Sequence, residues 1–161
     1  MTGFWIPQWL LVLVDIAAWG FFHAVTGYAA HRLDARRLQR DGWLLRARRF
    51  ESDGRWYRRT LHIHRWKDRV PEAGALFAGG ISKKELPALT PAGLGLFAQE
   101  TRRAELAHWW ALCCSPLFIL WNPLLPSVLL VTYGVLVNAP FIAIQRYNRF
   151  RTVALIERRA R

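Results

Sequence analysis

Residues 100–121 read Glu-Thr-Arg-Arg-Ala-Glu-Leu-Ala-His-Trp-Trp-Ala-Leu-Cys-Cys-Ser-Pro-Leu-Phe-Ile-Leu-Trp, a charged run followed directly by an apolar one. Its first nine residues hold two carboxylates, two guanidiniums and the imidazole of His108, and the residues from Trp109 onward are apolar or small. The pattern predicts a helix that enters a membrane with its ionisable groups gathered at the surface. Because ionisable groups beside hydrocarbon are costly, such a cluster indicates a functional site.

Positive charge and apolar sequence are separated along the chain. Hydrophobic residues make up 53% of the 161 residues, yet the formal net charge is +12. None of the 23 lysines and arginines lies in residues 1–31 or 104–144. A basic soluble domain would favour nucleic-acid binding, but this segregation is typical of a membrane protein and argues against a nucleic-acid partner.

Three apolar stretches, at about 4–30, 104–121 and 124–144, approach the roughly 20 residues that a helix needs to cross a bilayer. Asn122-Pro123 is expected to form the hairpin turn between the last two. The sequence therefore predicts an all-α integral membrane protein with about three transmembrane helices. It divides into an N-terminal anchor, a basic cytoplasmic segment, a transmembrane hairpin and a basic cytoplasmic tail, at residues 1–31, 32–103, 104–145 and 146–161.

The distribution of lysine and arginine also predicts the orientation. Cytoplasmic loops carry an excess of positive charge, whereas the N-terminus and the 122–123 turn carry none. We therefore expect a multi-pass protein of the cell membrane with its N-terminus outside. The segment 32–103 and the C-terminus are then cytoplasmic.

Local signals predict the structure between the spans. Residues 32–50 mix arginines with apolar side chains, which favours a basic amphipathic helix lying on anionic lipid or, alternatively, a solvated one. Thr90-Pro91 predicts the start of a helix that continues into the second span. Pro140 is expected to kink the third span. Turns are expected at 71–74 and 79–80, and a short capping box at 82–85.

Glu105 and His108 are three residues apart and share a helical face, which leaves three interpretations open. Glu-x-x-His is a metal-ligand spacing, and His62, His64, Glu72 and Glu100 could supply further ligands. Alternatively, His108 acts as a general base oriented by a carboxylate. The third interpretation is a structural network of carboxylates, arginines and the histidine that holds helices together.

Other polar residues stand at places where the chain is otherwise apolar. Asp15 lies near the middle of the first span and is either a functional group or a hydrogen-bond partner of another helix, for example at Thr132 or Tyr133. Asn138, Gln145 and Arg149 form one polar stripe on the third helix. The sequence from His64 to Asp68 is similar to the His-plus-Asp pairing of glycerolipid acyltransferases, but one residue shorter.

Three segments in this sequence carry a family resemblance. They are Glu100-Thr-Arg-Arg-Ala-Glu-Leu-Ala-His-Trp109, Arg65-Trp66-Lys67, and Asn138-Ala-Pro-Phe-Ile-Ala-Ile-Gln-Arg-Tyr-Asn-Arg149. In order and spacing the chain resembles the glycosyl-4,4'-diaponeurosporenoate acyltransferase family of carotenoid biosynthesis, over roughly residues 50–155. The first 50 residues agree only as an apolar anchor followed by basic sequence.

The resemblance implies transfer of a fatty acyl group to a hydroxyl of a sugar that is attached to a C30 carotenoid acid, the last step towards a staphyloxanthin-like pigment. It implies site residues in all three segments, namely Glu100, Arg103, Glu105, His108, Trp66, Lys67, Asn138, Gln145, Arg146, Asn148 and Arg149. His62, His64 and Asp68 lie outside the family's pattern.

We therefore predict a membrane acyltransferase that esterifies a sugar hydroxyl of a glycosylated carotenoid or a similar apolar glycolipid. His108, Glu105 and Glu100 are the expected catalytic residues, with Arg103 and Arg146 stabilising the oxyanion or binding the donor's phosphates. No resident cofactor or metal is expected, and acyl-CoA or acyl carrier protein would be the donor. Membrane lipids are further expected partners, as is a second copy of the chain. The alternatives are a non-enzymatic module that binds anionic lipids or a partner, and a metal-dependent enzyme.

Overall fold

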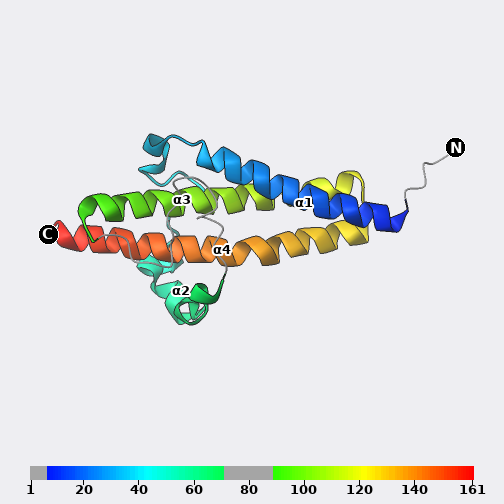
Figure 1. Ribbon diagram of the computed structural model, residues 1–161. Helices are drawn as coiled ribbons and strands as arrows, with labels where there is room; N and C mark the ends of the chain where they lie inside the picture. The colour runs from blue at the N-terminus through cyan, green and yellow to red at the C-terminus, as the bar shows by residue number, and fades with distance from the viewer. Residues whose placement is uncertain (1–6, 71–88) are drawn as a thin grey trace.

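The computed structural model describes residues 7–70 and 89–161, with the backbone alone at 52–53, and every regular element in these residues is helical. Three long helices form the body, namely α1 (Gln8–His31), α3 (Pro91–Cys114) and α4 (Leu124–Arg159). Figure 1 shows α3 and α4 running side by side, with α1 lying along the end of the bundle where α4 begins. The turns expected at 71–74 and 79–80, the capping box at 82–85 and the first residues of the anchor lie outside the described residues.

Short elements connect α1 to the rest of the bundle. They are η1 (Ala35–Leu38), η2 (Arg49–Gly54), α2 (Arg55–Arg59), η3 (Ile63–Arg65) and η4 (Lys67–Arg69). The expected amphipathic helix over 32–50 is wrong, because only 3₁₀ turns and irregular backbone occupy this stretch. Carbonyl groups of 38–46 accept hydrogen bonds from arginines of α3 and α4, and these bonds replace the intrahelical ones.

The start of α3 confirms the prediction made from Thr90-Pro91. The Thr90 hydroxyl accepts a hydrogen bond from the Gly93 amide at 3.1 Å, and Pro91 occupies the first turn. The helix ends at Cys114, and a 3₁₀ element, η6 (Ser115–Leu120), follows. Pro116 has no amide hydrogen to continue the α-helical pattern, so the expected second span is not one continuous helix.

The turn at Asn122-Pro123 is confirmed, and α4 starts directly after it. Its 36 residues correspond to about 54 Å, and the helix continues through Pro140 to Arg159. Residues 146–159 therefore extend α4 instead of forming a separate tail.

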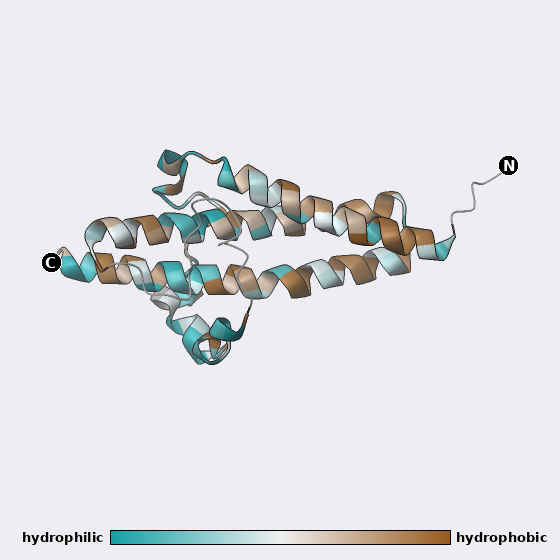
Figure 2. Cartoon of the chain, viewed as in Figure 1, coloured by the Kyte–Doolittle hydropathy of each residue, from teal (hydrophilic) through white to brown (hydrophobic). Residues whose placement is uncertain are grey.

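Apolar and charged residues occupy opposite ends of the bundle. Figure 2 shows hydrophobic colours gathered over α1, η6 and the first half of α4, and hydrophilic colours around α2 and the C-terminal end. Large apolar side chains are exposed at the hydrophobic end, including Ile16 and Phe21 of α1 and Leu124 and Leu136 of α4. Within the described residues, α1 and α4 are the two helices that are long and apolar enough to cross a membrane. An exposed apolar surface of this kind is typical of contact with lipid.

Candidate active site

His108 of α3 pairs with Asn138 of α4 where the apolar and charged ends of the bundle meet. Its Nδ1 lies 3.0 Å from the Asn138 Oδ1, and its ring stacks on Phe141 with the centroids 4.7 Å apart. His108 is half-buried, whereas Asn138 has no exposed surface. The expected polar stripe of α4 is thus directed at the interface with α3.

A hydrogen bond on Asn138 fixes the tautomer of neutral His108. The Asn138 amide nitrogen donates to the Gly134 carbonyl at 2.9 Å, which requires that its Oδ1 be the atom facing His108. An amide oxygen only accepts, so the Nδ1 of His108 carries the hydrogen. In the neutral ring the lone pair is then on Nε2, which is the arrangement of a general base held by an orienting partner.

Glu105 joins α3 to α4 through a buried ion network. Its carboxylate accepts from Arg146 Nη1 at 2.7 Å, from Arg149 Nη1 and from Trp109 Nε1 at 3.2 Å. Arg146 also donates to both oxygens of Glu51, at 2.7 and 2.9 Å. Because every one of these charges is buried and paired, the network fixes how the two helices sit against each other.

The same two arginines hold the segment before η2. Arg146 donates to the carbonyls of Leu44 and Arg46, at 3.2 and 2.8 Å, and Arg149 donates to Leu45 at 2.7 Å. Three consecutive carbonyls are therefore bound by α4. This explains why an arginine-rich stretch takes an irregular path instead of a helical one.

Arg102 and Arg103 anchor the chain around the end of α1. Arg102 donates to Asp41 at 2.6 Å and to the Leu38 carbonyl at 3.2 Å. Arg103 binds Glu100 at 3.1 Å and donates to three carbonyls at or just beyond the end of α1, those of Ala30, His31 and Leu33. The last carbonyls of a helix have no intrahelical donor, so Arg103 acts as a cap supplied by a neighbouring helix.

The network also changes the acidity of Glu51 and Tyr57. Burial alone would raise the pKa of Glu51, but hydrogen bonds from Arg146, the Arg48 amide and Tyr57 outweigh burial and hold the pKa below its ordinary value. Burial and the hydrogen bond to Glu51 raise the pKa of Tyr57. Both shifts favour the pairing of a charged Glu51 with a neutral Tyr57 hydroxyl.

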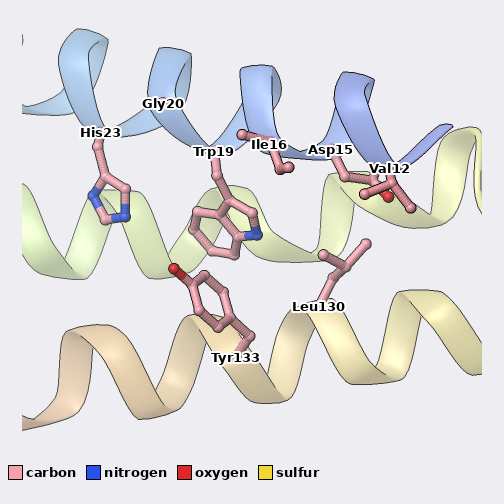
Figure 3. Close-up of a pocket in the computed structure, with 8 residues that line it drawn as sticks. All are labelled: Val12, Asp15, Ile16, Trp19, Gly20, His23, Leu130 and Tyr133. Carbon is pink, nitrogen blue, oxygen red and sulfur yellow. The ribbon is translucent and has the colours of Figure 1, made fainter. Parts of the chain in front are cut away.

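A groove of about 540 Å³ lies between α1 and α4, at the apolar end of the bundle. Figure 3 shows the Trp19 ring of α1 next to the Tyr133 ring of α4, with their centroids 5.5 Å apart. The described residues that line the groove are Val12, Asp15, Ile16, Trp19, Gly20, His23, Leu130 and Tyr133. The buried Trp19 Nε1 has no acceptor there. Gly134 lies against the Trp19 ring, and its carbonyl holds Asn138, so the groove begins one helical turn from the His108 pair.

Asp15 closes the far end of this groove. Its Oδ1 accepts from Trp121 Nε1 and Asn122 Nδ2, each at 2.8 Å. The partner is therefore the turn before α4, and the expectation of Thr132 or Tyr133 as partner was wrong. Thr132 instead donates to the Val128 carbonyl of its own helix.

The family assignment rests on most of the sequence. A family model described as glycosyl-4,4'-diaponeurosporenoate acyltransferase matches residues 41–158. The chain belongs to this family. Similar proteins include the glycosyl-4,4'-diaponeurosporenoate acyltransferases of Staphylococcus aureus strains bovine RF122 / ET3-1 and USA300, both 25% identical over 148 residues, and strain MRSA252, 24% identical. These matches cover 92% of this chain and 83% of each relative, and no solved structure matches the chain.

Membership of this family makes the chain an acyltransferase, and two of its three sequence segments meet in the structure. Residues 100–109 and 138–149 face each other across the α3–α4 interface, through the His108–Asn138 and Glu105–Arg146–Arg149 contacts. Glu100 binds Arg103 on its own helix. Gln145 is buried and its Oε1 has no donor, while Asn148 is half-buried.

The third segment stands apart from the His108 pair. Trp66 donates to the Leu61 carbonyl at 2.9 Å and packs on the cluster around Tyr57, while Lys67 is paired with Asp68. Asp68 therefore does not serve His64 as an orienting carboxylate.

The metal arrangement considered from the sequence does not form among the described residues. No group of three or more metal-ligating side chains is present in that part of the chain, and Glu72 lies outside it. The Glu105 carboxylate is instead taken up by two guanidiniums and an indole.

Sequence reasoning missed the acidic partners of the network. Glu51 and Asp41 stand in an arginine-rich stretch and pair with residues 95 and 61 positions away. The available signal was that few carboxylates stand among many arginines in 32–59, which makes each of them a candidate for a buried pair.

Proposed function

We propose that this acyltransferase moves a fatty acyl group from acyl-CoA or acyl carrier protein to a sugar hydroxyl of a glycosylated carotenoid or a similar apolar glycolipid. The names of the relatives support this acceptor class. The observation that carries the proposal in this chain is the His108–Asn138 pair, a histidine of fixed tautomer beside an apolar groove.

In the proposed reaction, His108 Nε2 takes the proton of the sugar hydroxyl while that oxygen attacks the acyl carbonyl of the thioester. The new ester bond forms, the carbon–sulfur bond breaks, and the leaving thiolate receives the proton from His108. Asn138 keeps the ring oriented through Nδ1–H during both transfers. Gln145 offers a buried oxygen that would accept from a sugar hydroxyl.

The remaining charged residues of the family segments take a different role in this proposal. Glu105, Arg146 and Arg149 hold α3 and α4 in register, and Glu100 supports Arg103 at the end of α1. Arg103 already donates to Glu100 and to three carbonyls, and every guanidinium nitrogen of Arg146 binds a protein group, so we assign both to positioning instead of oxyanion stabilisation. Trp66, Lys67 and Asn148 stay as proposed substrate contacts.

We further propose that α1 and the apolar half of α4 cross the cell membrane, with the N-terminus outside and the charged end cytoplasmic. The groove between them then opens to lipid and takes the apolar tail of the acceptor. A membrane-embedded tail and a sugar at the surface would bring the hydroxyl to the level of His108. A second copy of the chain would complete the enclosure of the site.

His108→Ala tests the proposal. Acyl transfer to the glycosylated acceptor by the purified protein in detergent is measured by mass spectrometry of the product. General acid–base catalysis contributes about 10²–10⁴-fold, so we expect the rate to fall by at least about 100-fold. Asn138→Asp keeps an acceptor for Nδ1 and should retain activity, whereas Asn138→Leu should not. His31→Ala, on the exposed end of α1, is the matched control. Full activity in His108→Ala would exclude the mechanism.

Cells that carry or lack the gene give a second measurement. The proposal expects their pigment and lipid extracts to differ by one fatty acyl group on a glycosylated molecule. Identical extracts would contradict it.

A further inference from the structure

The short helix α2 presents three arginines on one face. Arg55, Arg58 and Arg59 are spaced as i, i+3 and i+4, which places them together on a helix. The opposite side carries Tyr57, which is buried against Phe150 of α4 with ring centroids 6.3 Å apart. Packing of Tyr57 therefore fixes the direction in which the arginines point.

The backbone after α2 returns His64 to the same face. His62 adopts a left-handed conformation with φ of 48°, and the chain turns there into η3. Arg55, Arg58, Arg59 and His64 together line a cavity of about 370 Å³. This volume lies within the range of small-molecule sites, and all four lining side chains are basic.

Every described residue that lines this cavity is basic. Two acids close to it in sequence form ion pairs of their own, Glu51 with Arg146 and Asp68 with Lys67. Desolvation lowers the pKa of His64, and the positive charges of Arg58 and Arg65 lower it further. The complementary ligand is therefore an anion.

The arginines indicate which anion. A planar guanidinium matches phosphate with two parallel hydrogen bonds, and three guanidiniums in one cavity suit a ligand with several phosphate groups. The cavity also lies away from His108. Phe150 of α4, which packs against Tyr57 of α2, lies twelve positions beyond Asn138, which is about 18 Å along the helix axis. A donor with its phosphates at one end and its thioester at the end of a long arm fits this separation.

We propose that Arg55, Arg58, Arg59 and His64 bind the phosphate groups of an acyl donor of the coenzyme A type. The assignment of this ligand as donor rests on the proposed acyl transfer. It selects the nucleotide thioester over acyl carrier protein. The phosphate of an anionic lipid headgroup shares the same chemistry, and the experiment separates the two sources.

The test measures binding of coenzyme A to the purified full chain in detergent. Arg58→Gln/Arg59→Gln is compared with Arg36→Gln/Arg37→Gln, which removes the same charge from an exposed turn elsewhere. We expect the first pair to weaken coenzyme A at least about tenfold and the second less than about twofold. Coenzyme A that lacks the 3'-phosphate should bind wild type more weakly, and this difference should disappear in Arg58→Gln/Arg59→Gln. Unchanged circular dichroism establishes that the variants are folded.

If both double variants lost the same amount of coenzyme A affinity, net charge alone would explain the effect, and the proposed site would be wrong. Unchanged coenzyme A binding together with weaker flotation on phosphatidylglycerol vesicles would assign the cavity to lipid and overturn the donor proposal. Binding is measured without turnover, so the cavity and the acyl-transfer proposal can fail separately.

Discussion

Replacing Glu105 with Gln tests whether the buried network supports the fold. The Glu105 side chain has no exposed surface and binds two guanidiniums and an indole. Loss of its charge leaves Arg149 without its buried carboxylate partner and leaves Arg146 with Glu51 as its one acidic partner. Breaking a buried pair from one side costs about 3–5 kcal/mol.

In a protein of this size, each kcal/mol shifts the melting temperature by about 2–4 °C. We therefore expect Glu105→Gln to melt about 6–20 °C below wild type, by circular dichroism in detergent. Glu100→Gln is the matched control. It removes one partner of Arg103, which keeps its three carbonyl acceptors, and should cost about 1 kcal/mol or less.

A second variant separates a buried unpaired charge from a general loss of packing. Adding Arg149→Met to Glu105→Gln removes the guanidinium that has lost its buried carboxylate partner and keeps only the partly exposed Asp41 as an acidic partner, so the double variant should regain part of the lost stability. A Glu105→Gln protein that melts within about 2 °C of wild type would refute the structural role. If Glu105→Gln melted like wild type but lost as much activity as His108→Ala, Glu105 would instead take part in the reaction.

Two further predictions concern packing and pH. A methyl group added by Gly134→Ala would stand 2.7 Å from the Trp19 ring and 3.0 Å from the Ser115 Cβ. Overpacking costs about 1–3 kcal/mol, which should exceed the gain of up to about 1 kcal/mol from the higher helix propensity of alanine. The melting temperature of Gly134→Ala should therefore fall. A higher melting temperature would contradict the close approach of Gly134 to Trp19. The depressed pKa of Glu51 contributes stability that is present above its ordinary pKa and lost as the pH falls through its folded value. At neutral pH, Glu51→Gln should therefore be about 3 kcal/mol less stable than wild type. Urea unfolding should show that this difference in the free energy of unfolding shrinks below about pH 4.5. A difference that stays constant with pH would contradict this.

Local signals were sufficient to predict where α3 and α4 begin. Thr90-Pro91 caps α3 through a contact within four residues, and Asn122-Pro123 terminates one element and starts the next. The face shared by Asn138, Gln145 and Arg149 also follows from helical spacing, and all three are buried. Each of these features depends on neighbours in sequence, which is why residue patterns were enough.

The segment 32–50 could not be predicted in the same way. Its pattern of arginines and apolar residues satisfies a helix locally, but its carbonyls are bound by Arg102, Arg146 and Arg149 from elsewhere in the chain. These bonds join residues 64 to 104 positions apart. Tertiary hydrogen bonds to charged donors therefore outweighed the local preference.

Within the candidate site, the sequence indicated the residues but not their pairing. Glu105 or Glu100 was expected to orient His108, and Glu105 lies one helical turn from it on the same face. In the structure, His108 pairs with Asn138 across the interface, and Glu105 binds the α4 arginines Arg146 and Arg149. Spacing on one helix shows that two side chains share a face, but the side chains of the opposing helix decide what each one contacts.

The positions of these pairs explain why one short segment of α3 carries both chemistry and stability. Glu105 and His108 lie three residues apart on α3, and their partners Arg146 and Asn138 lie eight residues apart on α4. The ion network thus fixes the two helices within two turns of the proposed base. A shift of α4 by even one residue would remove Asn138 from His108, and the Nδ1 hydrogen would lose its acceptor. We therefore expect changes in the network that preserve folding to lower activity through the His108–Asn138 distance, as positioning residues would.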